Sequence, residues 1–262
     1  AISSVNIKDL NGLQWRTDLT FSRNREEIIQ LFGEQEDIIG SRWFIGHPIN
    51  SYYDYRFVGI WQDTPEDLEE ISKFANNSQN FSPGDIKIQD TNGDHLITID
   101  DKVILGSNVP KWIGSISSKL YFRGLEFSFL VYARAGQMIQ SDLHSSSVTT
   151  FTGGYNALNV EYWTKENASN DFFKPSKNGQ PQQFRSALDF RDGSFIRIQT
   201  ITLGYSLPHR IISNWNISQL RIYTTTYNPL LFTDYGGMDP ETATGVGSPP
   251  IKSLVFGINV GF

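Results

Sequence analysis

The sequence predicts an all-β fold, with about seven antiparallel strands forming part of the wall of a transmembrane β-barrel. Three observations predict it. Apolar and polar residues alternate in several segments of about ten residues, the length a membrane-spanning strand needs. The connections between these segments alternate between short and very long. The last alternating segment ends on an aromatic residue, Phe262.

Four of the alternating segments lie in the first 134 residues. Each places aliphatic or aromatic side chains on one parity and mainly polar or charged side chains on the other. Because successive side chains of a strand point to opposite faces, each strand would have one apolar and one polar surface. The segments are Leu13–Ser22, Tyr52–Gln62, Trp112–Phe122 and Leu125–Arg134.

The next segment, Ser194–Tyr205, changes phase partway along. Ile196 and Ile198 share one parity, whereas Leu203 has the other. A β-bulge near Gln199 would cause such a change, because it inserts one extra residue into the strand. A strand that leaves the membrane partway would do the same.

The last two predicted strands differ in how clear their alternation is. Gln219–Tyr227 is rich in Thr, and Leu220 and Ile222 mark its more apolar face. Leu254–Phe262 alternates large apolar residues with Val, Gly and Asn. A lipid-facing surface needs the large apolar side chains, and a crowded or wet barrel interior tolerates the others.

The connections differ greatly in length. Arg123 and Gly124 form a tight turn, and Leu207–Ser218 and Asn24–Ser41 are of intermediate length. Three connections are long and rich in Gly, Pro, Asn and Asp. They are Asp63–Lys111, Gly136–Gly193 and Asn228–Lys252. If the final strand runs toward the periplasm, these three all lie outside the cell, as in outer-membrane barrels.

One helix is predicted inside the first long connection. Thr64 is suited to cap its N-terminus, and Pro65 is suited to the first helical position. Leu68, Ile71 and Phe74 then follow at helical spacing.

Composition excludes several classes of function. The 262 residues have a net charge of −6, which argues against a nucleic-acid binder with a basic surface. The absence of cysteine excludes disulfides and thiol catalysis. No run of about 18 apolar residues is present, so no transmembrane helix is predicted. Ala1–Leu10 is polar and mixed, unlike a signal peptide.

Catalytic constellations are absent from the sequence. The histidines are scattered and form no His-x-x-x-His pair; they are His47, His95, His144 and His209. There is no phosphate loop, dinucleotide fingerprint or Gly-x-Ser-x-Gly motif. We therefore predict that the protein is not an enzyme. Loop aromatics such as Trp163 are expected to pack against neighbouring loops or a partner.

The sharpest local motif is an oxygen-rich loop with the spacing of a calcium-binding loop. Its metal positions would be occupied by Asp90, Asn92, Asp94, Leu96 through its carbonyl, Thr98 and Asp101. It departs from that pattern because His95 stands where glycine is expected and Asp101 is shorter than Glu. The alternative is an Asx turn whose side chains satisfy the loop's own backbone. We expect Ca²⁺ as a structural cofactor or none, and a structural role in either case.

Short stretches that occur in order over nearly the whole chain indicate a family. They are Trp15–Ser22, Gly46–Tyr53, Phe57–Gln62, Pro83–Lys87, Asp90–Asp94, Asp100–Lys102, Leu105–Gly106, Tyr162–Asn167, Asp192–Ile198, Thr202–Pro208, Tyr227–Tyr235 and Phe256–Phe262. This ordered set resembles the C-terminal portion of SusC/RagA-type TonB-dependent outer-membrane transporters of Bacteroidetes.

The resemblance implies a 22-stranded barrel filled by an N-terminal plug, with residues 1–262 as its C-terminal part. The plug, the earlier strands and the TonB-contacting segment would lie outside this chain. It also implies a Gram-negative outer membrane and the import of glycans or peptides. Expected partners are a SusD-like lipoprotein at the extracellular loops, the remaining barrel and plug, TonB and outer-membrane lipid, but no nucleic acid.

A second interpretation of the alternation is a soluble secreted β-sandwich that binds carbohydrate and uses the calcium loop as a structural element. It predicts polar outward faces and short loops at both ends. The apolar face of Leu254–Phe262 and the unequal connections favour the barrel.

Overall fold

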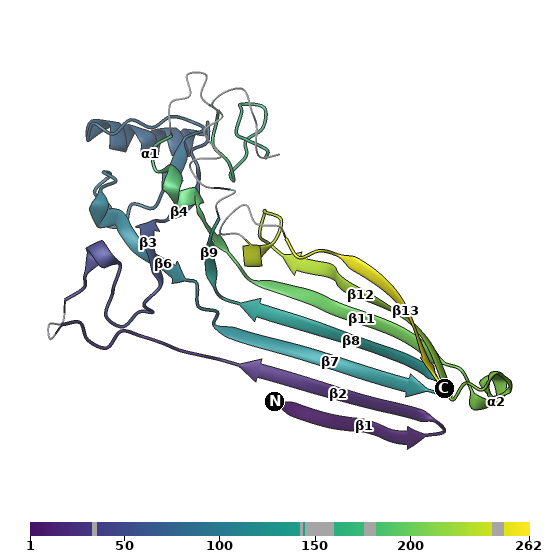
Figure 1. Ribbon diagram of the computed structural model, residues 1–262. Coiled ribbons are helices and arrows are strands. Elements are labelled where there is room, and N and C mark those ends of the chain that lie inside the picture. Colours follow the sequence, from purple (N-terminus) through teal and green to yellow (C-terminus); the bar gives the residue numbers. More distant parts are fainter. Residues whose placement is uncertain (33–35, 142–143, 145–159, 176–181, 243–248) are drawn as a thin grey trace.

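The computed structural model has one large antiparallel sheet and a lobe at one end of it (Figure 1). The described residues are 1–32, 36–141, 144, 160–175, 182–242 and 249–262. The sheet has seven strands in the order β1-β2-β7-β8-β11-β12-β13. They are β1 (Ile2–Leu10), β2 (Leu13–Ser22), β7 (Trp112–Phe122), β8 (Leu125–Ala135), β11 (Phe195–Ser206), β12 (Gln219–Thr233) and β13 (Ser253–Gly261).

Six of the predicted strands belong to this sheet, but Tyr52–Gln62 does not. It forms β3 (Ser51–Tyr55) and β4 (Phe57–Ile60), which pair with β6 (Lys102–Ser107) and β5 (Ile86–Ile88) in the lobe. The predicted alternation of apolar and polar residues is present, but the apolar side chains pack into a protein core. Ile60 and Trp61 are only 1% and 2% exposed, because they bury into the core of the lobe instead of facing lipid.

The seventh strand of the sheet is β1, which the alternation does not predict. Asn11 and Gly12 have φ of 55° and 87°, the left-handed conformation required by the two-residue hairpin turn that joins β1 to β2. The Asn-Gly pair was the signal available for this hairpin. With Tyr52–Gln62 counted as a strand of the sheet, the predicted set implies that Leu13–Ser22 runs away from the long connections. Tyr52–Gln62 lies in the lobe and β1 is in the sheet, so β2 runs toward the lobe instead.

The long connections all leave the sheet at the lobe end, as predicted. They cover residues 23–111, 136–194 and 234–252. The other end carries the two hairpin turns, α2 (His209–Ile212), the 3-10 helix η5 (Ser213–Trp215) and the C-terminus (Figure 1). Asn24–Ser41 lies at the lobe end rather than the turn end, since it belongs to the first long connection.

The phase change in β11 is a β-bulge. Its register shifts between Ile198 and Thr200 against both neighbours. Gln199 is the extra residue against β8, whereas on the other side β12 places two residues, Asn228 and Pro229, opposite Gln199. The predicted bulge is confirmed, and it keeps Ile196 and Leu203 on the same face of the sheet even though their parities differ.

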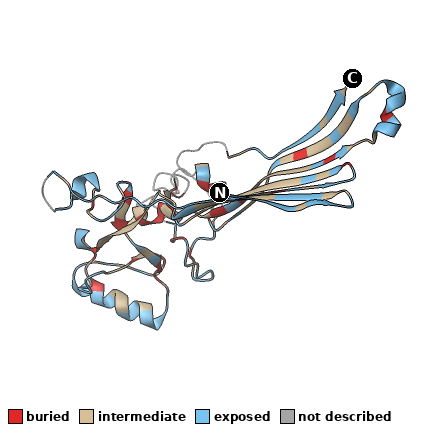
Figure 2. Ribbon diagram, turned by 90° about the horizontal axis from the view of Figure 1, so that it is seen from below, coloured by how far each residue is buried: buried red, intermediate tan, exposed pale blue. Residues whose placement is uncertain are grey.

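The lobe has a hydrophobic core of its own. Thr64 caps α1 by accepting a hydrogen bond from the Asp67 amide, as the sequence predicts. Phe74 and Leu188 pack with Trp61 in the core, and Figure 2 shows most buried residues gathered here. The other elements at this end are α1 (Pro65–Asn76), β9 (Met138–Gln140), β10 (Phe190–Asp192), η1 (Ile39–Ser41), η2 (Ile99–Asp101), η4 (Arg185–Leu188) and η6 (Pro240–Thr242).

The sandwich interpretation does not fit this topology. In the described part of the chain, the seven long strands form one sheet, and the remaining sheets have two strands each. A sandwich requires two packed sheets. Within the same residues, no helix is long and apolar enough to cross a membrane.

Candidate functional site

The two faces of the large sheet carry different side chains. One row of residues, in register from β2 to β13, is Trp15, Leu120, Phe127, Leu203, Thr224 and Phe256. The adjacent row on the opposite face is Arg16, Lys119, Ser128, Thr202, Thr225 and Val255. The first face is an apolar band, on which Phe256 is 76% exposed. The second is a polar face.

Some polar groups within the band are hydrogen-bonded. Trp15 Nε1 donates to Ser118 Oγ at 2.9 Å, which satisfies both groups on the apolar side. The polar face has its own network, in which Arg221 binds Glu126 at 2.8 Å and the hydroxyls of Thr202 and Thr225 are 2.9 Å apart. One polar atom of this row, Thr224 Oγ1, is buried without a hydrogen-bond partner among the described residues. The face is otherwise apolar, which suits lipid, where unpaired polar groups are costly.

A buried ion cluster holds the connection after β12 against the sheet. Arg197 Nη2 donates to both carboxylate oxygens of Asp239, at 2.8 Å and 2.7 Å, and Nη1 lies 2.8 Å from Glu241. The Arg197 and Asp239 side chains are 5% and 6% exposed. The sequence did not predict this cluster, because 42 residues separate Arg197 from Asp239.

A second buried cluster joins the connections after β8 and β12. Ser141 Oγ lies 2.7 Å from His144 Nδ1 and 2.7 Å from the Tyr235 hydroxyl. Burial, together with the Arg191 charge, lowers the pKa of His144 to about 4. Although serine and histidine are in contact, Ser141 is 0% exposed, so no substrate reaches its hydroxyl. The contacts therefore hold the two connections together.

The predicted calcium loop forms a series of turns. Asp90 accepts hydrogen bonds from the amides of Gly93 and His95, at 2.7 Å and 2.9 Å. Asp101, which is fully buried, accepts from the amides of Thr91 and Thr98, each at 2.8 Å. These are the contacts of the Asx-turn alternative. Among the described residues, no group of three or more His, Cys, Asp or Glu side chains is placed to hold a metal.

The remaining ligand positions of the loop follow the same pattern. Asn92 Oδ1 accepts from the Asp94 amide at 3.0 Å, and Asp94 Oδ1 accepts from the Leu96 amide at 2.8 Å. Thr98 caps η2 through a capping box with Asp101. Calcium binding by the loop stays a prediction.

The loop aromatics pack against neighbouring parts of the chain, as expected. Trp163 is buried, and its Nε1 donates to Gln62 Oε1 at 2.9 Å. Tyr235 is buried beside His144, and half-buried Trp43 lies 6.3 Å from the Phe32 ring.

Comparison with known proteins was made for sequence and structure. No protein-family model matches the chain. It is 25% identical over 291 residues to TonB-dependent receptor P26 of Formosa agariphila, covering all of this chain and 28% of the relative. It is 25% identical over 211 residues to TonB-dependent receptor SusC of Bacteroides thetaiotaomicron, covering 79% of this chain and 18% of the relative.

Solved structures of the RagAB peptide transporter have the same fold. One superposes with a TM-score of 0.72 at 26% identity, covering 98% of this chain and 28% of that chain. The open-open state of the RagAB peptide importer gives 0.70 at 25% identity over 99% of this chain. The chain thus spans about a quarter of the length of the relatives it matches.

The calcium interpretation predicts measurable binding. Calorimetric titration of the full-length receptor with Ca²⁺ should give a heat of binding that the Asp90→Asn and Asp94→Asn double variant loses, because a hard cation needs the carboxylate oxygens. Glu66→Gln, which removes a charge from exposed helix surface, is the control and should bind as the parent does. If the parent protein gives no heat of binding, the calcium interpretation is refuted and the loop is an Asx turn only.

Removal of the Arg197 side chain should release the connection after β12. In Arg197→Gln, buried Asp239 loses its cation, which costs about 3–5 kcal/mol. We expect faster amide hydrogen exchange across residues 235–242. Arg221→Gln is the control on the same polar face; its pair with Glu126 is partly exposed and is worth about 1 kcal/mol or less. Unchanged exchange in Arg197→Gln would contradict the role of the cluster.

Proposed function

We propose that this chain, part of a SusC/RagA-type TonB-dependent receptor, forms a section of the wall of an outer-membrane channel that imports nutrients. The observation that carries this proposal is the division of one continuous sheet into an apolar band and a polar face, with the three long connections at one end. The similarity to TonB-dependent receptors extends over the whole chain.

The two faces define an orientation in the membrane. The apolar band contacts lipid, and the polar face lines the interior of the barrel. The lobe lies outside the cell, and the short turns and Phe262 lie in the periplasm, since outer-membrane barrels place their long loops outside. Further strands, the plug and the TonB contact come from the rest of the receptor.

The lobe is suited to hold a partner as well as to cap the wall. Its first connection exposes large apolar side chains, with Phe32 at 85% and Ile29 at 74%. Exposed apolar side chains that gather on one loop mark a contact surface. We infer that a SusD-like surface lipoprotein contacts this lobe and delivers the substrate. RagAB is a peptide importer, and we propose peptides or glycans as the substrate class here.

The non-enzymatic assignment fits the same observations. The relatives are named as receptors and importers, not as enzymes. The one buried Ser–His contact in the described residues is closed to substrate. Any ion bound by the Asp90–Asp101 loop would shape the lobe, because this loop packs on α1 through Asn77, whose side chain donates to the carbonyls of Asp94 and His95.

A charge on the apolar band should prevent assembly, whereas the same charge on the polar face should not. Leu203→Arg places a cation in lipid, which costs about 2–4 kcal/mol near the membrane midplane. Thr202→Arg, one residue away, faces the interior. We expect full-length Leu203→Arg to be depleted from the outer membrane relative to Thr202→Arg, measured by detergent extraction and heat-modifiable migration. Equal assembly, or a parent protein that is soluble without detergent, would refute the proposal.

A further inference from the structure

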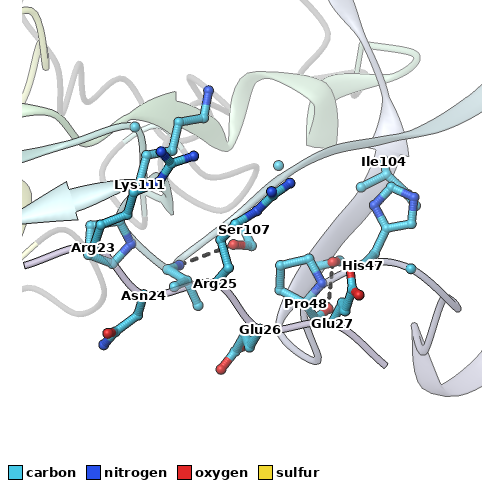
Figure 3. Close-up of a pocket in the computed structure, with 16 residues that line it drawn as sticks. Arg23, Asn24, Arg25, Glu26, Glu27, His47, Pro48, Ile104, Ser107 and Lys111 are labelled. Atoms are coloured by element: carbon cyan, nitrogen blue, oxygen red, sulfur yellow. Dashed lines mark hydrogen bonds between the residues drawn. The ribbon is translucent and has the colours of Figure 1, made fainter. Parts of the chain in front are cut away.

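A cavity of about 330 Å³ lies where β2 leaves the sheet and the chain enters the lobe (Figure 3). Three cations line it. Arg23 and Arg25 come from the extended segment after β2, and Lys111 comes from the residue before β7. All three are exposed, so their charges are accessible from outside the protein.

These three cations have no carboxylate partner among the described residues. None of them takes part in an ion pair, although Glu26 and Glu27 line the same cavity. Alternation in the extended segment sends Glu26 to the side opposite Arg23 and Arg25. Glu27 shares the parity of the two arginines but, in the described part of the chain, forms no ion pair with either. Figure 3 shows Arg25 and Lys111 directed to one side of the segment and Glu26 to the other.

The stem of Lys111 lies beside the end of β8. Gly136, at φ 80°, lies against the Lys111 side chain, and a Cβ there would lie 2.6 Å from Lys111 Cγ and Cδ. The Lys111 amide donates to the Ala135 carbonyl at 2.8 Å. Glycine at this position thus leaves room for the lysine stem beside the end of β8.

The cations lie directly beyond the end of the apolar band. Phe21 and Trp112 stack there with ring centroids 6.2 Å apart, and Phe21 is 64% exposed. Arg23 follows Phe21 by two residues, and Lys111 immediately precedes Trp112. Aromatic side chains at the edge of an apolar band mark the level of the lipid headgroups, and long basic side chains just beyond them reach headgroup charges.

We propose that Arg23, Arg25 and Lys111 bind the phosphate of a lipid headgroup in the outer leaflet. Guanidinium groups form paired charge-assisted hydrogen bonds with phosphate oxygens, and the ammonium adds a third charge. The inference rests on the proposed function, because it requires that the apolar band contact lipid. A soluble anion would meet the same chemistry, but the place of the cations next to Phe21 and Trp112, at the end of the apolar band, favours a lipid.

The test uses full-length receptor in detergent and lipid A, which carries two phosphates, as the probe. Native mass spectrometry measures the lipid retained by the parent and by the Arg23→Gln, Arg25→Gln, Lys111→Gln triple variant. We expect the triple variant to bind at least about tenfold more weakly, because each basic residue near a membrane surface contributes to anion attraction. Dephosphorylated lipid A should bind the parent as weakly as lipid A binds the triple variant.

The matched control removes three exposed cations at the turn end of the sheet, through Lys8→Gln, Arg123→Gln and Arg210→Gln, and should bind as the parent does. Equal retention by parent and triple variant would overturn the proposal. Full displacement of lipid A by inorganic phosphate at equal phosphate concentration would also overturn it, because it would indicate a site for soluble anions. A parent protein that needs no detergent would refute the proposed function itself, whereas equal lipid retention by a membrane-extracted receptor refutes only this site.

Discussion

Backbone N–H and C=O groups that enter lipid must be hydrogen-bonded within the protein. The continuous antiparallel sheet meets this requirement between its strands, and the outer edges of β1 and β13 need further strands to meet it. The rest of the structure follows from it. In the described part of the chain, irregular segments lie at the two ends of the sheet, and described residues of the long connections form a lobe with its own core around Trp61 and Phe74. Because successive side chains of a strand point to opposite faces, every second residue of each strand faces lipid. The bulge at Gln199 preserves this division where the sequence changes phase.

Ion pairs and hydrogen bonds between distant segments hold the lobe end together. Arg197 fixes the connection after β12 to the sheet, and Ser141 joins that connection to the one after β8 through Tyr235. Both clusters are buried, so their cost of desolvation is offset only while every partner stays in place. The lobe is therefore attached to the sheet at defined points.

Sequence predicted most of the wall but less of the lobe. Six strands, the bulge and the Thr64 cap follow from local pattern and turn chemistry. Tyr52–Gln62 was misplaced because alternation alone does not distinguish a lipid-facing strand from one packed on the lobe core. The β1 hairpin was missed although Asn11 and Gly12 signalled it. The Arg197 cluster and the cation cavity depend on contacts between distant segments, which no local pattern reveals.

The orientation of the wall is the central claim, and labelling of single cysteines in cells tests it most directly. The chain has no cysteine, so Ser72→Cys on α1 and Ser213→Cys in η5 each supply a unique thiol in this chain. In a full-length receptor otherwise free of cysteine, a membrane-impermeant maleimide should label the Ser72→Cys variant in intact cells. The Ser213→Cys variant should react only after the outer membrane is permeabilised. The reverse pattern, or equal labelling of both in intact cells, would contradict the orientation.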